Sequence, residues 1–445
     1  MRPWQPRKSH GARPALWLTV GAAVVGAGGA WAAITASGES PGSGSSASIS
    51  GDAAPTTVSP RGAASGAGRQ SLDARESELR GTLGRTLRES GPASGAWVLD
   101  VSDRQTLFAR REHRRRSLAS NTKLFTAAAA LRRLGAGARL ATVVLGDGEL
   151  RPDHTFRGDL YLKGSGDPSL SRAGLQVLAR RLVAEHGIQR VTGRIVDDES
   201  AFDDRRGTRS SAYGVSREID ASLSALALHG VISDNPPAFA AARLHDELEA
   251  QGVRIDSSPR DGNAPTDARP LARIQSPTVA RLVRTTLKGS SNLHSELLLK
   301  AVARAQGSQG ATRRGLRSVA VFARRLGSWP ILVDGSGLSL DSRASPRSVG
   351  KLLLAMRGLP EFGAFHAALP IAGRDGTLRK RMRGTAARGR CRAKTGTRVT
   401  VSALSGYCST RSGDTVVFSL LTNETDPIAA KRLEDRMTAA IARLG

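Results

Sequence analysis

The chain has 445 residues, enough for two or three domains that each bury their own core. Its formal net charge of +27 raises the question of nucleic acid. Only nine of the basic residues are Lys, however, the Arg residues are spread along the chain, and no zinc-finger spacing, RNA-binding aromatic signature or leucine zipper occurs. We therefore expect a generally anionic partner and no nucleic acid, and two Cys with eight scattered His indicate neither a metal site nor a cofactor.

The N-terminus has the layout of a targeting segment. Residues 1–13 carry four basic residues and no acid, and an uncharged, partly apolar run follows from Pro14 to Ser37. Residues 30–32 (Ala-Trp-Ala) offer a small-x-small cleavage site, yet the run approaches the ~20 residues that span a bilayer. We expect residues 1–35 to be a signal peptide or a single membrane anchor, with the anchor favoured, and the protein to be exported.

Residues 36–70 are mostly Gly, Ser, Ala and Pro, which predicts a flexible linker. The folded part starts near Ser71 with an amphipathic helix over 71–89. A hairpin is predicted over 96–108, and a helix that begins around Lys123 and ends at Gly135.

Between residues 139 and 265 the pattern changes to short strand-like pieces, interrupted by helical stretches near 173–186 and 237–251. We interpret 139–265 as an inserted, β-rich domain that divides the flanking domain into 71–138 and 266–445.

Helices are predicted next at 278–288, 293–305, 312–326 and 345–357. The chain ends with three strands at about 391–397, 402–408 and 415–421, and with a helix capped by Asp426. The predicted buried stripe of this helix is Ile428, Leu433, Met437, Ile441 and Leu444. Helices before an antiparallel meander, with a terminal helix packed back, indicate a layered α/β domain.

Three short strings stand in a fixed order: Ser-Asn-Thr-Lys at 120–123, Ser-Ser-Asn at 290–292 and Lys-Thr-Gly at 394–396. Ser120 and Lys123 lie one turn apart on one helix face, and a serine hydroxyl becomes a nucleophile only when a nearby base takes its proton. Lys can be that base only if its pKa is depressed. Seen alone, an N-cap serine and a surface lysine are the simpler interpretation.

The other two strings have alternatives as well. Ser290 and Asn292 lie in a predicted interhelical loop, where a helix cap is an equally open interpretation. Lys394 on a predicted edge strand offers a positive charge to a substrate carboxylate, and Gly396 leaves room for substrate backbone. Two decoys, residues 348–351 (Ser-Val-Gly-Lys) and 233–235 (Ser-Asp-Asn), are rejected because they break the order or fall in the insert.

The ordered strings, together with residues 158–162, 334–339, 369–378, 392–397 and 401–407, resemble the class C low-molecular-mass penicillin-binding proteins. These are the D-alanyl-D-alanine carboxypeptidase/endopeptidases, and the similarity covers roughly 71–445. The resemblance implies an α/β, transpeptidase/β-lactamase-like catalytic domain, an antiparallel sheet flanked by helices, with a large inserted domain. It also implies a penicillin-sensitive serine carboxypeptidase that acts on peptidoglycan stem peptides through an acyl-enzyme, and it leaves an additional endopeptidase activity open.

On that resemblance, Ser120 attacks the carbonyl between two D-alanines and Lys123 is the base. Ser290 and Asn292 relay protons and orient the substrate, although Ser291 stands where Asp is common. The substrate-binding residues of the third string are Lys394, Thr395, Gly396 and Thr397. Lys394 and Thr395 hold the terminal carboxylate, and the backbone N–H groups of Ser120 and Thr397 form the oxyanion hole.

The expected partners are peptidoglycan peptides ending in D-Ala-D-Ala, β-lactam antibiotics and an anionic cell wall or membrane surface. The expected location is the extracytoplasmic face of a bacterial cell membrane, or outside the cell. A serine β-lactamase is disfavoured because no Glu-x-x-Leu-Asn string occurs, and a catalytically idle penicillin-binding scaffold because the key residues are intact. An ordinary Ser-His-Asp hydrolase is disfavoured because the only Gly-x-Ser-x-Gly match, residues 38–42, lies in the linker.

The two cysteines fall on neighbouring strands. If 391–397 and 402–408 form a hairpin around the loop 398–401, Cys391 lies directly opposite Cys408. Export permits a disulfide between them, which a closely spaced, non-hydrogen-bonded pair could form. Two free thiols in a half-buried sheet are an equally open alternative.

Overall fold

The computed structural model describes the backbone of residues 66–445 and the side chains from residue 73 onward. The expected signal peptide or anchor, and nearly all of the expected linker, lie outside the described residues. None of the helices that the model describes has the length and hydropathy needed to cross a bilayer.

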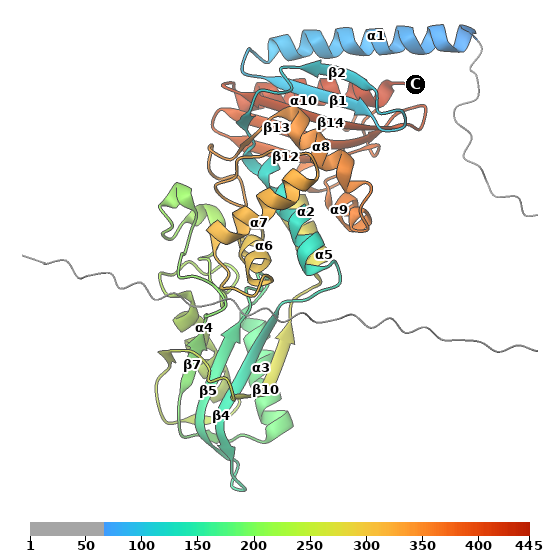
Figure 1. Cartoon of the computed structure of the whole chain (residues 1–445). Helices are drawn as coiled ribbons and strands as arrows, with labels where there is room; N and C mark the ends of the chain where they lie inside the picture. The colour runs from blue at the N-terminus through green and yellow to red at the C-terminus, as the bar shows by residue number, and fades with distance from the viewer. Residues whose placement is uncertain (1–65) are drawn as a thin grey trace, which may run out of the picture. The chain divides into compact units, whose positions relative to one another are not determined.

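The described part of the chain contains both helices and strands (Figure 1). The α-helices are α1 (Gly66–Glu89), α2 (Thr122–Leu134), α3 (Arg172–His186), α4 (Pro236–Glu249), α5 (Val279–Lys288), α6 (Asn292–Arg304), α7 (Thr312–Arg325), α8 (Pro346–Met356), α9 (Phe362–Ala368) and α10 (Pro427–Arg443). The longer strands are β1 (Gly95–Asp100), β2 (Thr106–Arg110), β4 (Ala141–Leu150), β5 (Thr155–Gly164), β7 (Ile195–Asp198), β10 (Arg269–Gln275), β12 (Cys391–Arg398), β13 (Val401–Ser409) and β14 (Thr415–Asn423). The two-residue strands are β3 (Arg116–Ser117), β6 (Arg190–Val191), β8 (Arg254–Ile255), β9 (Arg260–Asp261) and β11 (Arg343–Ala344).

A five-stranded antiparallel sheet, in the order β12-β13-β14-β1-β2, is the framework of the catalytic domain. Its strand residues alternate between two cores, because successive side chains of a strand point to opposite faces. Ala96 and Val98 pack with α1 and α10, whereas Trp97 and Leu99 pack with α2 and α8. The expected α/β fold, an antiparallel sheet flanked by helices with an additional β-rich domain, is confirmed.

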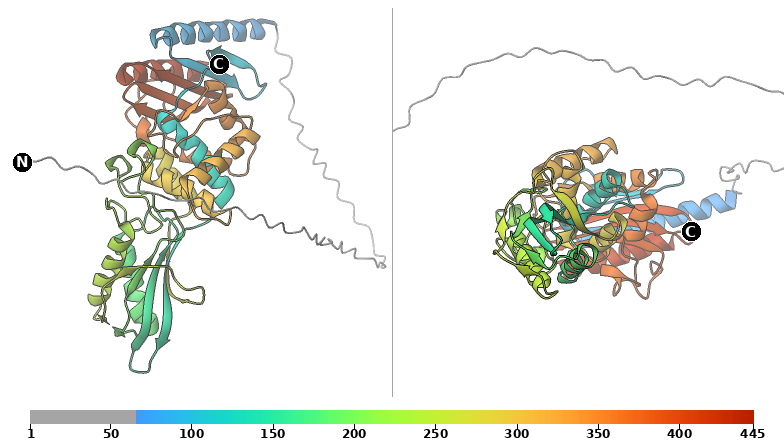
Figure 2. Two further views of the ribbon diagram at one scale, coloured as in Figure 1. Left: turned by 60° about the vertical axis from the view of Figure 1, so that its left-hand side comes forward. Right: turned by 90° about the horizontal axis from the view of Figure 1, so that it is seen from below.

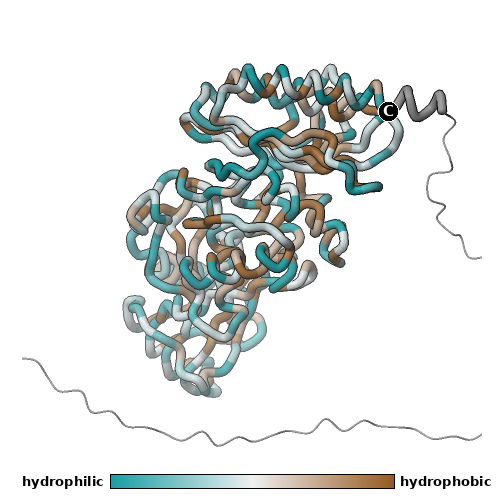
Figure 3. The backbone as a smooth tube through the Cα atoms, turned by 45° about the horizontal axis from the view of Figure 1, so that its top comes forward, coloured by the Kyte–Doolittle hydropathy of each residue, from teal (hydrophilic) through white to brown (hydrophobic). Residues whose placement is uncertain are grey.

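Hydrophobic stretches recur along the strands and helices, whereas many loops are hydrophilic (Figure 3). The terminal helix begins as expected: the Asp426 carboxylate accepts hydrogen bonds from the N–H groups of Ile428 and Ala429. Its predicted buried stripe is wrong at one end, because the side chain of Ile428 is 64% exposed. The buried face of α10 also includes a charged residue: Glu434 is fully buried and forms an ion pair with Arg381 at 2.9 Å.

The insert contains a second sheet, in which β4, β5 and β10 are antiparallel and the short strands β6–β9 extend it in parallel. Helices α3 and α4 pack on this sheet around Leu178 and Leu244 (Figure 2). The boundary expected at residue 265 falls too early, since β10 pairs with β4 through Gln275. The insert therefore returns to the catalytic domain at about Pro277, directly before α5.

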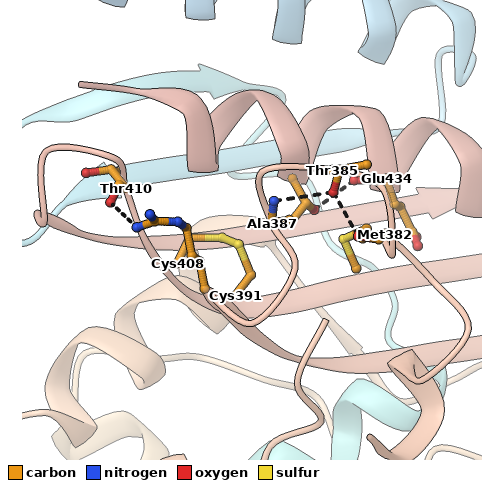
Figure 4. The surroundings of a disulfide bond; sticks show 9 residues. Met382, Thr385, Ala387, Cys391, Cys408, Thr410 and Glu434 are labelled. Carbon is orange, nitrogen blue, oxygen red and sulfur yellow. Dashed lines mark hydrogen bonds between the residues drawn. A yellow bond between two sulfur atoms is a disulfide. The ribbon is translucent and has the colours of Figure 1, made fainter. Parts of the chain in front are cut away.

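The hairpin of β12 and β13 has the register that the sequence suggests, with Cys391 opposite Cys408 and Thr397 opposite Ser402. Its turn is tighter than the loop expected at 398–401, because Arg398 still pairs with Val401. Cys391 and Cys408 form a disulfide (Figure 4), with their Cα atoms 4.0 Å apart.

Candidate active site

The three strings converge where α2, the α5–α6 loop and the strand β12 meet. The Lys123 ammonium group donates to Ser120 Oγ at 3.0 Å and to Asn292 Oδ1 at 2.7 Å. On the other side, the Lys394 ammonium group donates to Ser290 Oγ at 3.0 Å. The four residues that the sequence predicts as catalytic, and the cation of the third string, thus form two hydrogen-bonded groups, one around each lysine. The two lysines are close enough for the charge of Lys123 to act on Lys394.

Ser120 lies in a short 3₁₀ turn, Ala119–Asn121, directly before α2. The backbone of Ala119 has φ 43°, a left-handed conformation that is strained for a residue with a Cβ and that recurs at functional sites. The turn is held from two sides. Asn121 Nδ2 donates to the carbonyl of Lys394 at 3.1 Å, and Gly337 approaches so closely that a Cβ there would lie 1.8 Å from the Ala119 oxygen.

The environment of Lys123 favours the neutral amine. The side chain is fully buried, and burial lowers the pKa of Lys123 from 10.5 to about 7. The carboxylates of Glu296 and Asp334 oppose this shift, whereas the Arg398 guanidinium adds to it. With a pKa near neutrality, a substantial fraction of Lys123 is unprotonated at pH 7 and can accept a proton, as a lysine base must.

Two buried acids next to Lys123 were not identified from the sequence. Glu296 accepts hydrogen bonds from the N–H groups of Gly335 at 3.0 Å and Ser336 at 2.8 Å, and burial raises the pKa of Glu296 to about 7. Asp334 accepts from the N–H of Gly337, 2.8 Å away, and burial raises the pKa of Asp334 as well.

These acids position a loop rather than point at the nucleophile. Because Glu296 and Asp334 hold the backbone of residues 335–337, the Ser336 carbonyl lies 2.6 Å from Lys123 Nζ and accepts its third hydrogen bond. The available signal was an acidic residue directly before an apolar run of three Leu, four positions after Asn292.

The residues of the second string have two roles, one as a helix cap and the others in the site. The middle residue, Ser291, is the N-cap of α6 and accepts from the His294 N–H at 3.3 Å. Ser290 has φ 61°, and its hydroxyl is directed to Lys394. The capping interpretation therefore applies to Ser291, while the hydroxyl of Ser290 and the amide of Asn292 reach the two lysines.

Lys394 is fully buried, and burial, followed by the positive charge of Lys123, holds the pKa of Lys394 well below its ordinary value. Its ammonium group also donates to the Thr395 carbonyl at 2.8 Å. Thr395 Oγ1 lies 2.8 Å from Thr377 Oγ1. A bound carboxylate would supply the counter-charge that a buried ammonium group needs.

The strand β12 is an edge strand, as expected, and its outer side faces the site. The N–H of Ala393 donates to the backbone carbonyl of Pro370, which lies outside the sheet, at 3.0 Å. Since outward and inward N–H groups alternate along an antiparallel strand, those of Thr395 and Thr397 also point away from β13. The N–H of Thr397 thus points to the outer side of β12, a direction compatible with the oxyanion role that the resemblance implies.

Gly396 is also needed for packing, which the sequence analysis did not predict. A Cβ at this position would lie 2.7 Å from the Leu118 oxygen and 3.2 Å from the Ala119 Cβ. The glycine therefore lets β12 approach the segment that carries Ser120, in addition to any room it leaves for a substrate.

The insert reaches this site through Glu218, in the 3₁₀ turn Arg217–Ile219. The backbone carbonyl of Glu218 accepts from Asn292 Nδ2 at 2.6 Å, and its carboxylate pairs with Arg398 at 2.7 Å. The insert thereby contacts both the second string and the strand that carries the third.

Both decoys have structural roles elsewhere. Ser348 Oγ accepts from the Trp329 N–H at 2.8 Å and lies 2.9 Å from Ser328 Oγ. Asn235 is the N-cap of α4, accepting from the Ala238 N–H at 3.3 Å.

Comparison with known proteins gives consistent matches. The chain matches the family model described as the D-Ala-D-Ala carboxypeptidase 3 (S13) family over residues 85–216 and 218–444. It is 29% identical to a D-alanyl-D-alanine carboxypeptidase of Actinomadura sp. (strain R39), over 83% of this chain and 85% of that protein.

Two solved structures share the fold. Penicillin-binding protein 4 of Haemophilus influenzae matches with a TM-score of 0.69 and 19% identity, over 81% of this chain and 97% of that one. A penicillin G-acylated predatory endopeptidase of Bdellovibrio bacteriovorus matches with a TM-score of 0.52 and 17% identity, over 79% and 92%.

Proposed function

The chain belongs to the D-Ala-D-Ala carboxypeptidase 3 (S13) family and is a serine-type D-alanyl-D-alanine carboxypeptidase, and from this premise we propose that Ser120 is its nucleophile. The observation that carries the assignment is the position of Lys123, whose ammonium group contacts Ser120 Oγ at 3.0 Å and Asn292 Oδ1 at 2.7 Å. With a pKa of about 7, Lys123 is neutral in about half of the molecules at pH 7.

In the first step, Ser120 Oγ attacks the carbonyl carbon of the penultimate D-alanine while its proton passes to Lys123 Nζ. Asn292 and the Ser336 carbonyl hold the amine in place and stabilise the ammonium ion that forms. The N–H groups of Ser120 and Thr397 receive the negative charge that develops on the substrate oxygen. The amide bond then breaks, and the leaving nitrogen takes, through the hydroxyl of Ser290, the proton that Lys123 received, so that Lys123 returns to the neutral amine.

At the other end of the substrate, Lys394 and Thr395 bind the terminal carboxylate. The buried ammonium group of Lys394 gains a counter-ion, and a negative charge close by favours its protonated form. Water then attacks the acyl-enzyme and releases the shortened peptide and free Ser120. Binding a carboxylate at this end favours substrates in which the residue after the scissile bond carries a free α-carboxylate.

The substrate is a peptidoglycan stem peptide that ends in D-Ala-D-Ala, and β-lactams acylate the same serine. The family and the penicillin-acylated relative of the same fold support both assignments. A β-lactamase would in addition need a base for rapid deacylation, and Glu296 does not fit that role, because its oxygens bind the N–H groups of Gly335 and Ser336. A catalytically idle scaffold has no need of a buried lysine aimed at a serine hydroxyl.

We also propose that the protein works on the extracytoplasmic face of a bacterial membrane or outside the cell. The N-terminal sequence and the disulfide between Cys391 and Cys408 support this location, because disulfides persist in oxidising compartments. Added protease should degrade the protein in intact spheroplasts, and complete protection would count against the proposal.

Labelling with a fluorescent penicillin tests the nucleophile. Ser120→Ala should abolish labelling, whereas Ser348→Ala, at the decoy string, should retain it. Peptide mapping of the wild-type adduct should place the label on Ser120. Labelling that survives Ser120→Ala would refute the assignment.

A further inference from the structure

Three adjoining hollows lie on the catalytic domain around α7 and α8. The first, of about 840 Å³, is bordered by the ends of α2 and α6 and by α7, and its basic lining residues are Arg132, Arg133, Arg314, Arg317 and Arg325. It shares Leu326 with the second hollow, of about 500 Å³. Together with the third hollow, described next, they form a continuous surface that we call the basic band.

The second hollow carries Arg104, Lys351 and Arg357. It shares Lys351 with the third, of about 550 Å³, which adds Arg115 and Arg347. Of the described residues that line the three hollows, ten are Arg or Lys and none is Asp or Glu. At the chain's overall ratio of 39 acidic to 66 basic residues, ten charged residues would include about four acids.

Among the described residues, two acids pair with residues that line the hollows. Glu361 pairs with Arg132 at 3.1 Å, and Glu112 with the His113 ring of the third hollow at 3.2 Å. The band is thus a surface of one sign, of the kind that binds anions.

Apolar side chains are interleaved with these cations. Trp329, in the third hollow, is 59% exposed, and Val321, in the first, is 45% exposed. Phe322, Leu326 and Leu354 line the first two hollows and are half-buried. A hydrophilic polyanion makes no use of exposed Trp and Val side chains, whereas the interface of an anionic bilayer binds cations and apolar side chains together.

We propose that the basic band is the surface through which the catalytic domain docks on an anionic lipid bilayer. The guanidinium and ammonium groups bind phosphate headgroups, while Trp329 and Val321 enter the interface between headgroups and acyl chains. Ser120, in the 3₁₀ turn directly before α2, and Arg132, which α2 carries into the first hollow, are twelve positions apart, or about 18 Å at 1.5 Å per residue. Docking therefore holds the nucleophile within roughly this distance of the lipid surface.

A probe at Trp329 tests the proposal on the full chain. Within the described residues, both cysteines form the disulfide and no other Cys occurs in the sequence, so Trp329→Cys can carry an environment-sensitive fluorophore. The labelled chain is added to vesicles of phosphatidylglycerol and phosphatidylcholine in equal parts, and to vesicles of phosphatidylcholine alone. The N-terminal apolar segment is present in both samples, so the comparison isolates the effect of lipid charge.

We expect a blue shift of the emission with the anionic vesicles only, and its loss at high salt. In the same background, the triple variant Arg314→Glu, Arg317→Glu and Arg325→Glu should lose the shift. A triple variant of matched charge on exposed residues of the insert, Arg157→Glu, Arg180→Glu and Arg209→Glu, should keep it.

Several outcomes would overturn the proposal: no shift with anionic vesicles, an equal shift with neutral vesicles, or an equal loss in both triple variants. A shift with long-chain polyphosphate but not with anionic vesicles would assign the band to a soluble polyanion instead. Penicillin labelling of Ser120 should persist in every variant and shows that the fold is intact. Because the readout does not involve turnover, its failure leaves the proposed peptidase function standing.

Discussion

The ionisation of Lys123 should control the rate at which penicillin acylates Ser120. If burial lowers the Lys123 pKa to about 7, the amine is neutral in about half of the molecules at pH 7 and in about a tenth at pH 6. A lysine with its ordinary pKa of 10.5 would be neutral in only about 0.03% at pH 7, roughly 10³-fold less. The shift corresponds to about 5 kcal/mol of differential stabilisation of the neutral amine.

The assay is the second-order rate constant for acylation by a fluorescent penicillin, measured between about pH 5 and pH 9. The logarithm of this rate constant should rise with a slope of one up to about pH 7 and then level off, because loss of one proton activates the base. Acylation that is independent of pH over this range would refute the role of Lys123.

Two variants should move this limb in opposite directions. Glu296→Gln removes a negative charge that favours the ammonium ion, so the Lys123 pKa should fall and the limb should move to lower pH. Arg398→Gln removes a positive charge that disfavours it, so the limb should move to higher pH. Glu249→Gln, an exposed acid in the insert, serves as the control. Since Glu296 itself has a pKa of about 7, a limb that vanishes in Glu296→Gln would assign the titration to that acid and contradict our reasoning.

Three further predictions concern β12. Lys394→Ala should slow turnover of a D-Ala-D-Ala peptide far more than turnover of the same peptide with an amidated C-terminus, and equal losses would exclude carboxylate binding. Gly396→Ala should lower the free energy of unfolding by ~1–3 kcal/mol and also slow acylation, because its Cβ would lie 2.7 Å from the Leu118 oxygen; wild-type melting and acylation would contradict this. Replacing Cys391 and Cys408 by Ser should lower the free energy of unfolding by at most ~3 kcal/mol, because the cysteines are only 17 positions apart. Two free thiols titrated in the unreduced, denatured wild-type protein would show that the disulfide does not form.

The parts of the site that the sequence could predict depend on short-range geometry. Ser120 and Lys123 meet because residues three apart share a helix face, and the pairing of Thr397 with Ser402 follows from a tight hairpin between two recognisable strands. The position of Lys394 on the first strand of this hairpin was predicted from the same strand pattern, and the strand lies at the edge of the sheet. That the three strings, far apart in the sequence, meet in one site was predicted from the family resemblance and not from local geometry.

The features that were missed depend on contacts between distant segments. An acidic residue in a helix is ordinarily exposed to solvent, and only the hydrogen bonds from the backbone N–H groups of Gly335 and Ser336 explain why Glu296 is buried. The strand β10 extends the insert beyond residue 265 because it pairs with β4, more than 120 positions earlier. The contact of Glu218 with Asn292 likewise joins two domains whose packing no local periodicity records.

The exposed Ile428 illustrates a different limit. A helical stripe predicts which side of α10 faces the sheet, but it does not tell how far along the helix the sheet extends. The first turn of α10 is exposed at Ile428, whereas Met437 and Ile441, further along, are fully buried.

The central strand order also sets a schedule for folding. Strand β1 pairs with β14, so Gly95 meets Leu421 only after some 320 further residues have been made. At a synthesis rate of roughly 5–20 residues per second, the first hairpin waits about 15–65 s for its neighbour. During that interval one edge of β1, together with the apolar side chains of Leu79 and Leu83 that α10 later covers, remains without its native partner. Chains that lose their last strand or helix should therefore aggregate or be degraded, even though all three catalytic strings have already been synthesised.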